Sequence, residues 1–145
     1  MNFRRVALAA LACWVLYMGL SYVVHGVLLK PTYLKYTDAM RPEAQSAAIL
    51  PMGFGAALVG FFAFAYAYAK GYEGGNGVQE GLRFGVLVAI MICAFATVWE
   101  YMVWPMGPRL FGAWVVDFFV EFSIYGIVTG LIYTPAAGAV RRAVM

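Results

Sequence analysis

The chain has 145 residues, of which 64% are hydrophobic and 12% charged, and its formal net charge is +3. A mean hydropathy of +0.79 excludes an ordinary soluble domain, because four long apolar stretches account for it. The ten lysines and arginines are spread over ends and loops, which excludes a clustered nucleic-acid-binding surface. We therefore expect one all-α transmembrane domain over residues 1–145, a four-helix bundle with both termini cytoplasmic.

The first predicted span covers about residues 6–29. Its apolar run is longer than the ~7–15-residue core of a cleaved signal peptide, so we expect the span to be retained. Its polar side chains lie toward its far end and are Tyr17, Ser21, Tyr22 and His25. Ser21 and Tyr22 precede His25 by four and three residues, so an α-helix would place all three on one face.

The loop at 30–46 is amphipathic and contains Tyr33 and Tyr36, which is typical of a segment anchored at the membrane interface. A lid over a cavity is the alternative interpretation of this loop.

The second predicted span covers about residues 47–69. Its small residues Ala56 and Gly60 predict close packing against a neighbouring helix.

The glycine-rich segment at 70–80 has no strand before it and no Gly-Lys-Ser/Thr ending. It predicts a flexible cytoplasmic turn and not a phosphate-binding loop. The third predicted span follows at about residues 82–104, with Glu100 one turn from its end.

The fourth predicted span covers about residues 110–133 and carries two carboxylates in an apolar run. Asp117, Glu121 and Tyr125 follow one another at four-residue spacing, so they project from one helical face. Gly126 and Gly130 form a small-xxx-small pair away from that face, which predicts helix packing. An ionised carboxylate in hydrocarbon costs a few kcal/mol, so this face should meet a partner or a cavity.

Six lysines and arginines lie inside and four outside if both termini are cytoplasmic, which favours that orientation. At about 1.5 Å per residue, His25 and Glu100 are then each roughly 6 Å below the outer boundary. Asp117 is roughly 12 Å deep and Glu121 roughly 18 Å, near the midplane. The sequence thus predicts titratable groups at successive depths of one bundle.

Three interpretations of these groups remain open. They could form a pathway or binding site for a small solute or ion, lined by His25, Glu100, Asp117, Glu121, Tyr17, Tyr22, Ser21 and Tyr125. They could hold a divalent metal, with His25, Glu100 and Asp117 as candidate ligands, or contribute to a haem site. They could also be a structural network that fixes helix register.

The sequence contains no nucleophile elbow and no His-Glu-x-x-His motif, which argues against an enzyme. Cys13 and Cys93 lie in apolar runs without metal-ligand spacing, so we interpret both as core-filling side chains.

The run His25-Gly26-Val27-Leu28-Leu29, followed by a polar loop and a span with a tyrosine-rich end, resembles small uncharacterised bacterial four-span inner-membrane proteins. The resemblance implies a multi-pass protein of a bacterial inner membrane and carries no activity or cofactor with it. The leading functional expectation is therefore binding or passage of a small solute or ion. The alternative is an accessory or scaffold subunit of a membrane complex. Beyond the lipid bilayer, we expect a homo-oligomer or a larger complex and no nucleic acid.

Overall fold

The computed structural model describes residues 1–134 and consists of helices joined by short connections. The elements in chain order are α1 (Phe3–Ser21), η1 (Tyr22–Leu28), α2 (Lys30–Tyr33), η2 (Thr37–Ala39), α3 (Glu43–Gly71), α4 (Gly77–Ile92), η3 (Cys93–Thr97), α5 (Val98–Val103) and α6 (Pro108–Tyr133). Four continuous helices are long and apolar enough to cross a bilayer: Phe3–Leu28, Glu43–Gly71, Gly77–Val103 and Pro108–Tyr133. The predicted all-α four-helix bundle is confirmed, and the chain is a multi-pass membrane protein.

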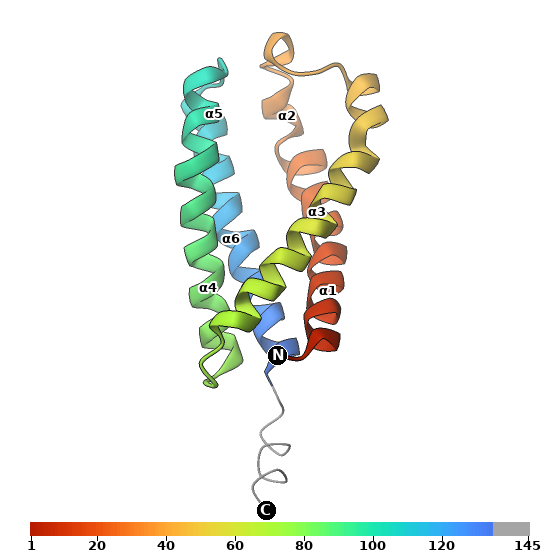
Figure 1. The fold of residues 1–145 in the computed structure, drawn as a ribbon. Helices are drawn as coiled ribbons and strands as arrows, with labels where there is room; N and C mark the ends of the chain where they lie inside the picture. The colour runs from red at the N-terminus through yellow and green to blue at the C-terminus, as the bar shows by residue number, and fades with distance from the viewer. Residues whose placement is uncertain (135–145) are drawn as a thin grey trace, which may run out of the picture.

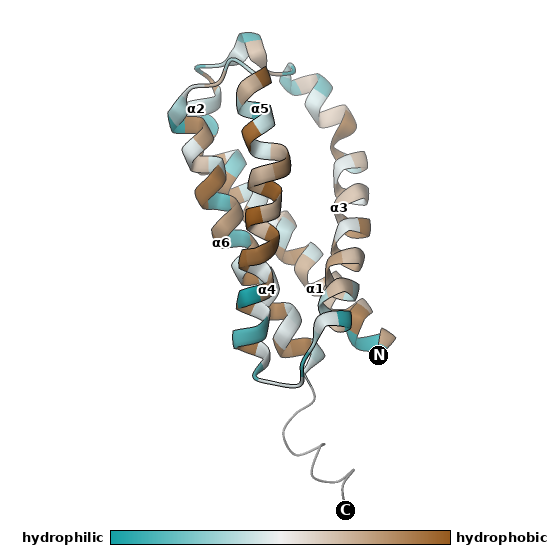
Figure 2. Ribbon diagram, turned by 60° about the vertical axis from the view of Figure 1, so that its left-hand side comes forward, coloured by the Kyte–Doolittle hydropathy of each residue, from teal (hydrophilic) through white to brown (hydrophobic). Residues whose placement is uncertain are grey.

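The four spans extend between the same two ends of the molecule, and most of the apolar colour lies between those ends (Figure 2). The N-terminus and the last turn of α6 share one end of the bundle (Figure 1), where the Arg5 guanidinium donates to the carbonyl of Tyr133 at 2.8 Å. We call this the N-terminal end, and the opposite end, which carries α2, the α2 end.

The third span begins five residues before the predicted boundary. Asn76 caps it, because the Asn76 side-chain oxygen accepts hydrogen bonds from the backbone of Val78 and Gln79. Part of the predicted glycine-rich turn is therefore the first helical turn of α4. The glycines at 77, 81 and 85, with Ala89, form a buried stripe along this helix.

The stripe on α4 packs against Gly126 and Gly130 of α6. A Cβ on Gly126 would collide with the backbone oxygen of Gly81, and a Cβ on Gly130 with that of Gly77. Such a close approach of two helical backbones is possible only where both carry small residues. The α4–α6 pair is consequently the most tightly packed part of the bundle.

The predicted packing role of Ala56 and Gly60 is wrong within this chain. Both residues are exposed, and a Cβ on Gly60 would meet no atom within 4 Å. The physical reason is the course of α3, which crosses α1 and diverges from α4 and α5 toward the α2 end (Figures 1 and 2). The small-residue face of α3 therefore borders open space instead of a helix.

Aromatic rings close the space between α3 and α4 toward the N-terminal end. The Phe64 and Phe84 ring centroids are 4.7 Å apart, and those of Phe61 and Tyr125 are 4.9 Å apart. Nearer that end, the ring of Tyr68 also packs edge-to-face on that of Phe84. This aromatic layer joins α3, α4 and α6 on the N-terminal side of the point where α3 diverges from α4.

The end of the first span is π-helical, with Leu29 N–H bonded to the Val24 carbonyl at 2.8 Å. The wider turn changes which side chains share a face with His25. Tyr22 is 71% exposed and lies outside the bundle, whereas Ser21 and His25 stay on its inner side. The predicted shared face of all three residues is corrected accordingly.

Candidate functional site

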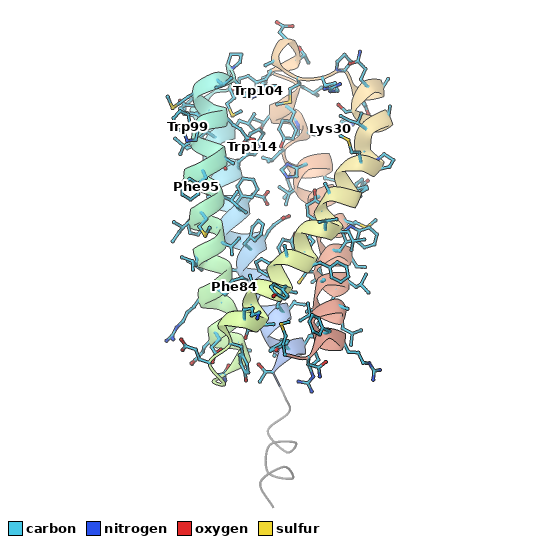
Figure 3. The ribbon with its side chains drawn as sticks, viewed as in Figure 1. Lys30, Phe84, Phe95, Trp99, Trp104 and Trp114 are labelled. Carbon is cyan, nitrogen blue, oxygen red and sulfur yellow. The ribbon has the colours of Figure 1, made fainter. Side chains whose placement is uncertain are left out.

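A cavity of about 740 Å³ lies between α1, α3, α4 and α6. The wall from α3 includes Gly60, Ala63 and Ala67, so the small residues of that helix provide its width. Most of the remaining lining is aliphatic or aromatic, and Phe84 lies where α3 and α4 approach each other (Figure 3). The cavity is only partly enclosed, because α3 and α4 diverge from Phe84 toward the α2 end.

The polar wall of the cavity comes mainly from α6. Asp117 is 7% exposed, Glu121 5% and Tyr125 1%, although all three belong to a span suited to hydrocarbon. The Tyr125 hydroxyl donates to Glu121 Oε2 at 2.7 Å. Glu121 Oε1 is buried and has no hydrogen-bond partner among residues 1–134. This free oxygen belongs to a side chain on the cavity wall.

His25 connects α6 with the short helix α2. Its Nε2 is 3.4 Å from Asp117 Oδ2, and its Nδ1 is 2.6 Å from the Tyr33 hydroxyl. The Trp114 indole donates to the same hydroxyl at 2.9 Å. Because indole N–H is a donor only, the Tyr33 oxygen accepts from Trp114, and its own hydrogen is free to point to Nδ1. That arrangement favours a His25 proton on Nε2, facing Asp117.

Of the other predicted site residues, Tyr17 and Ser21 line the cavity, and Tyr17 packs against Phe61 with ring centroids 5.7 Å apart. Glu100 does not line this cavity. It is exposed and borders a second cavity, of about 360 Å³, that lies toward the α2 end and shares His25 with the first. The structure thus brings His25, Asp117 and Glu121 together and leaves Glu100 beside them.

The geometry does not support the predicted metal ligand set. Within residues 1–134, no three side chains of the His, Cys, Asp and Glu types are grouped closely enough to hold a metal ion. His25 and Asp117 are adjacent, whereas Glu100 borders the other cavity and forms no ion pair with His25.

Sequence reasoning interpreted Tyr33 as an interface anchor and missed its place in this network. Tyr33 and Trp114 are separated by 81 positions in the chain, so no local pattern could have paired them. The alternative interpretation of the loop at 30–46, a lid over a cavity, is closer to this arrangement, because it places Tyr33 and Tyr36 beside a cavity. Tyr33 can contact His25 because α2 follows directly after the π-helical end of the first span.

Burial raises the pKa of the Tyr33 phenol, the Trp114 hydrogen bond lowers it, and the nearby charge of Asp117 raises it. The folded state therefore holds the phenol proton of Tyr33 more tightly than the unfolded state does. The stability that this proton contributes is lost as the pH rises from the ordinary tyrosine pKa of about 10 through the higher pKa of the folded state.

We expect Tyr33→Phe to flatten this alkaline decline in stability. The variant should also lose about 1 kcal/mol of stability at neutral pH, because the Trp114 N–H is left unpaired. Thermal unfolding in maltoside micelles at neutral and alkaline pH measures both effects. An unchanged alkaline decline in the variant would contradict the assignment.

The fold and the site together define a multi-pass four-helix membrane protein with a partly open intramembrane cavity that carries two buried carboxyl groups. Comparisons with known protein families, with curated proteins and with solved structures find no match for the chain.

Proposed function

We propose that the protein binds, inside the membrane, a small molecule that has an apolar body and a cationic group, such as an alkylamine. The single observation that carries this proposal is the buried carboxyl of Glu121 on the wall of an apolar cavity, with one oxygen that has no partner among residues 1–134. A volume of about 740 Å³ lies within the range of ordinary small-molecule sites.

The balance of charge indicates a cation. His25 is the basic side chain beside the two acids, and its Nε2 faces Asp117. Glu121 forms no ion pair with any residue from 1 to 134. An ionised carboxylate in this position is costly unless a cation or a proton offsets its charge. An alkylamine would supply that cation at Glu121 and place its chain against the apolar wall.

The shape of the cavity supports binding in preference to passage. Asp117 and Glu121 lie nearer the α2 end than the aromatic layer of Phe61, Phe64, Phe84 and Tyr125, which joins three of the four spans. A solute could cross the bundle only if that layer opened. In contrast, the divergence of α3 and α4 leaves a lateral opening through which an amphipathic molecule could arrive from the lipid.

The resemblance and the charge distribution support a bacterial inner membrane with the α2 end outward. The described residues place four lysines and arginines near each end: Arg4, Arg5, Lys70 and Arg83 at one, and Lys30, Lys35, Arg41 and Arg109 at the other. The excess on the inner side therefore depends on Arg141 and Arg142, which lie outside the described residues.

The test is a calorimetric titration of the purified protein in maltoside micelles with octylamine, with 1-octanol as the matched uncharged probe. We expect saturable binding of octylamine and none of octanol. Glu121→Gln should weaken binding by at least about thirty-fold, because it removes one member of a buried charge pair. Glu43→Gln, an exposed acid at the start of α3, is the control and should bind as the parent does. Equal binding of the two probes, or an unaffected Glu121→Gln variant, would overturn the proposal.

A further inference from the structure

The second cavity, of about 360 Å³, is built largely from aromatic rings. It lies at the α2 end, between the segment from α2 to η2 and the residues around the α5–α6 connection. Tyr33 and Tyr36 come from the first side, Trp104 and Trp114 from the second. Glu100 supplies the carboxylate of the lining, and His25 is shared with the larger cavity.

The rings are held in place by contacts across the cavity. The hydroxyl of Tyr33 bonds to Trp114 and to His25, so its position is fixed from two helices. Tyr36 reaches the opposite side, where its hydroxyl lies so close to Gly107 that a Cβ there would collide with it. Glycine at 107 therefore permits this tyrosine to cross from one side of the cavity to the other. The aromatic lining is preorganised before any ligand arrives.

Tryptophans near the ends of membrane helices commonly serve as interface anchors, which face lipid. Trp99 fits that description, since it is 59% exposed and lies on the side of α5 away from α2 (Figure 3). Trp104 and Trp114 instead lie on the side toward α2 and line the cavity (Figure 3). Trp104 is 51% exposed, but it lines the cavity together with Trp114, Tyr33 and Tyr36, and simple anchoring does not account for rings gathered around one cavity.

The charge of the lining is negative. Glu100 forms no ion pair with any described residue, and no lysine or arginine of residues 1–134 lines this cavity. An anion would therefore find no basic partner apart from His25, whose Nε2 is directed to Asp117. A cation would meet one carboxylate and several aromatic rings, and the faces of such rings attract positive charge through their quadrupoles.

From this geometry we propose that the aromatic cavity binds a methylated ammonium group, either of a small free cation or of a lipid headgroup. A methylated ammonium ion donates no hydrogen bonds when it is quaternary, and it is recognised by aromatic cages of this composition. The cavity lies at the level of the outermost helical turns, where both sources can reach it. This site is distinct from the Glu121 cavity and does not depend on the proposed alkylamine binding there.

The first experiment uses purified protein in dodecyl maltoside, which contributes no ammonium group, and titrates tetramethylammonium chloride by calorimetry against ammonium chloride. We expect saturable binding of tetramethylammonium alone. Trp104→Leu and Glu100→Gln should each weaken it about three- to thirty-fold, the range for loss of one cation–aromatic or surface-level charge contact. Trp99→Leu is the matched control and should leave the affinity unchanged, since that ring faces away from the cavity.

The second experiment distinguishes a lipid headgroup from a free cation as the source of the methylated ammonium group. The protein is placed in phosphatidylglycerol nanodiscs with a small fraction of phosphatidylcholine, and co-purifying lipid is measured by native mass spectrometry. Retention of phosphatidylcholine by the parent and its loss in Trp104→Leu would identify a headgroup site. Saturable tetramethylammonium binding without lipid retention would identify a site for a free cation. No saturable binding in either experiment, or an equal loss in Trp99→Leu, would overturn the proposal, and neither outcome bears on octylamine binding at Glu121.

Discussion

Alanine in place of Gly126 is expected to lower the free energy of unfolding by about 3 kcal/mol, the upper part of the range for overpacking. The added Cβ would collide with the backbone oxygen of Gly81 and crowd the nitrogen of Gly85. Backbone atoms of a helix cannot rotate aside as a long side chain can, so α4 and α6 would have to separate. Thermal unfolding in maltoside micelles, followed by helical circular dichroism, measures the change.

Gly112→Ala is the matched control, because this glycine lies on the same helix and a Cβ on it would meet no atom within 4 Å. Alanine is the better helix former by about 1 kcal/mol, so the control should be as stable as the parent or slightly more stable. The two substitutions are chemically identical and are expected to differ in sign. Equal effects at positions 112 and 126 would show that α4 and α6 are not in backbone contact.

The four spans could be predicted from the sequence because their apolar content is summed over more than 20 residues and does not depend on any single contact. The stripe at 77, 81 and 85 has the same four-residue spacing as Gly126 and Gly130. The sequence analysis does not predict this stripe, because it places Gly77 in the turn at 70–80 and leaves Gly81 outside a third span that begins at about Leu82. The N-cap at Asn76 is the local signal that could have extended the helix.

The site could be predicted only in part. The four-residue spacing of Asp117, Glu121 and Tyr125 fixes one polar wall on any α-helix, and these three side chains do line one cavity. The turn at Tyr22–Leu28 is π-helical and not α-helical, so the residues that accompany His25 could not be assigned from α-helical spacing. The course of α3, which gives the cavity its width, depends on contacts between distant segments of the chain and could not be predicted from local patterns.

The packing of α4 and α6 and the position of the acids are connected. The glycine face of α6 fixes this helix against α4 over its second half, and the acidic face points to the space that α3 leaves open. The rigid pair therefore holds Asp117 and Glu121 in place without using them as packing residues. If the acids serve a ligand and not the fold, removing them should not weaken the bundle.

Replacing Glu121 and Tyr125 together by Met and Phe is expected to stabilise the protein by up to about 3 kcal/mol, the cost attributed to an acid near the centre of a membrane helix. Both side chains are nearly inaccessible, and Tyr125 donates to Glu121, so apolar groups of similar shape remove donor and acceptor at once. The same double variant should no longer bind octylamine. Unfolding midpoints and calorimetric titration measure the two effects on one preparation.

The two single variants are the controls for the double variant. Glu121→Met leaves the buried Tyr125 hydroxyl without its acceptor, and Tyr125→Phe leaves both oxygens of Glu121 without a hydrogen bond from the part of the chain that the structure describes. Each single variant should therefore be less stable than the double variant by about 1–3 kcal/mol. A network that exists to fix helix register predicts the opposite order, with the double variant the least stable of the four proteins. If that order were observed, the carboxyl of Glu121 would belong to the fold, and its place on the cavity wall would no longer argue for a ligand.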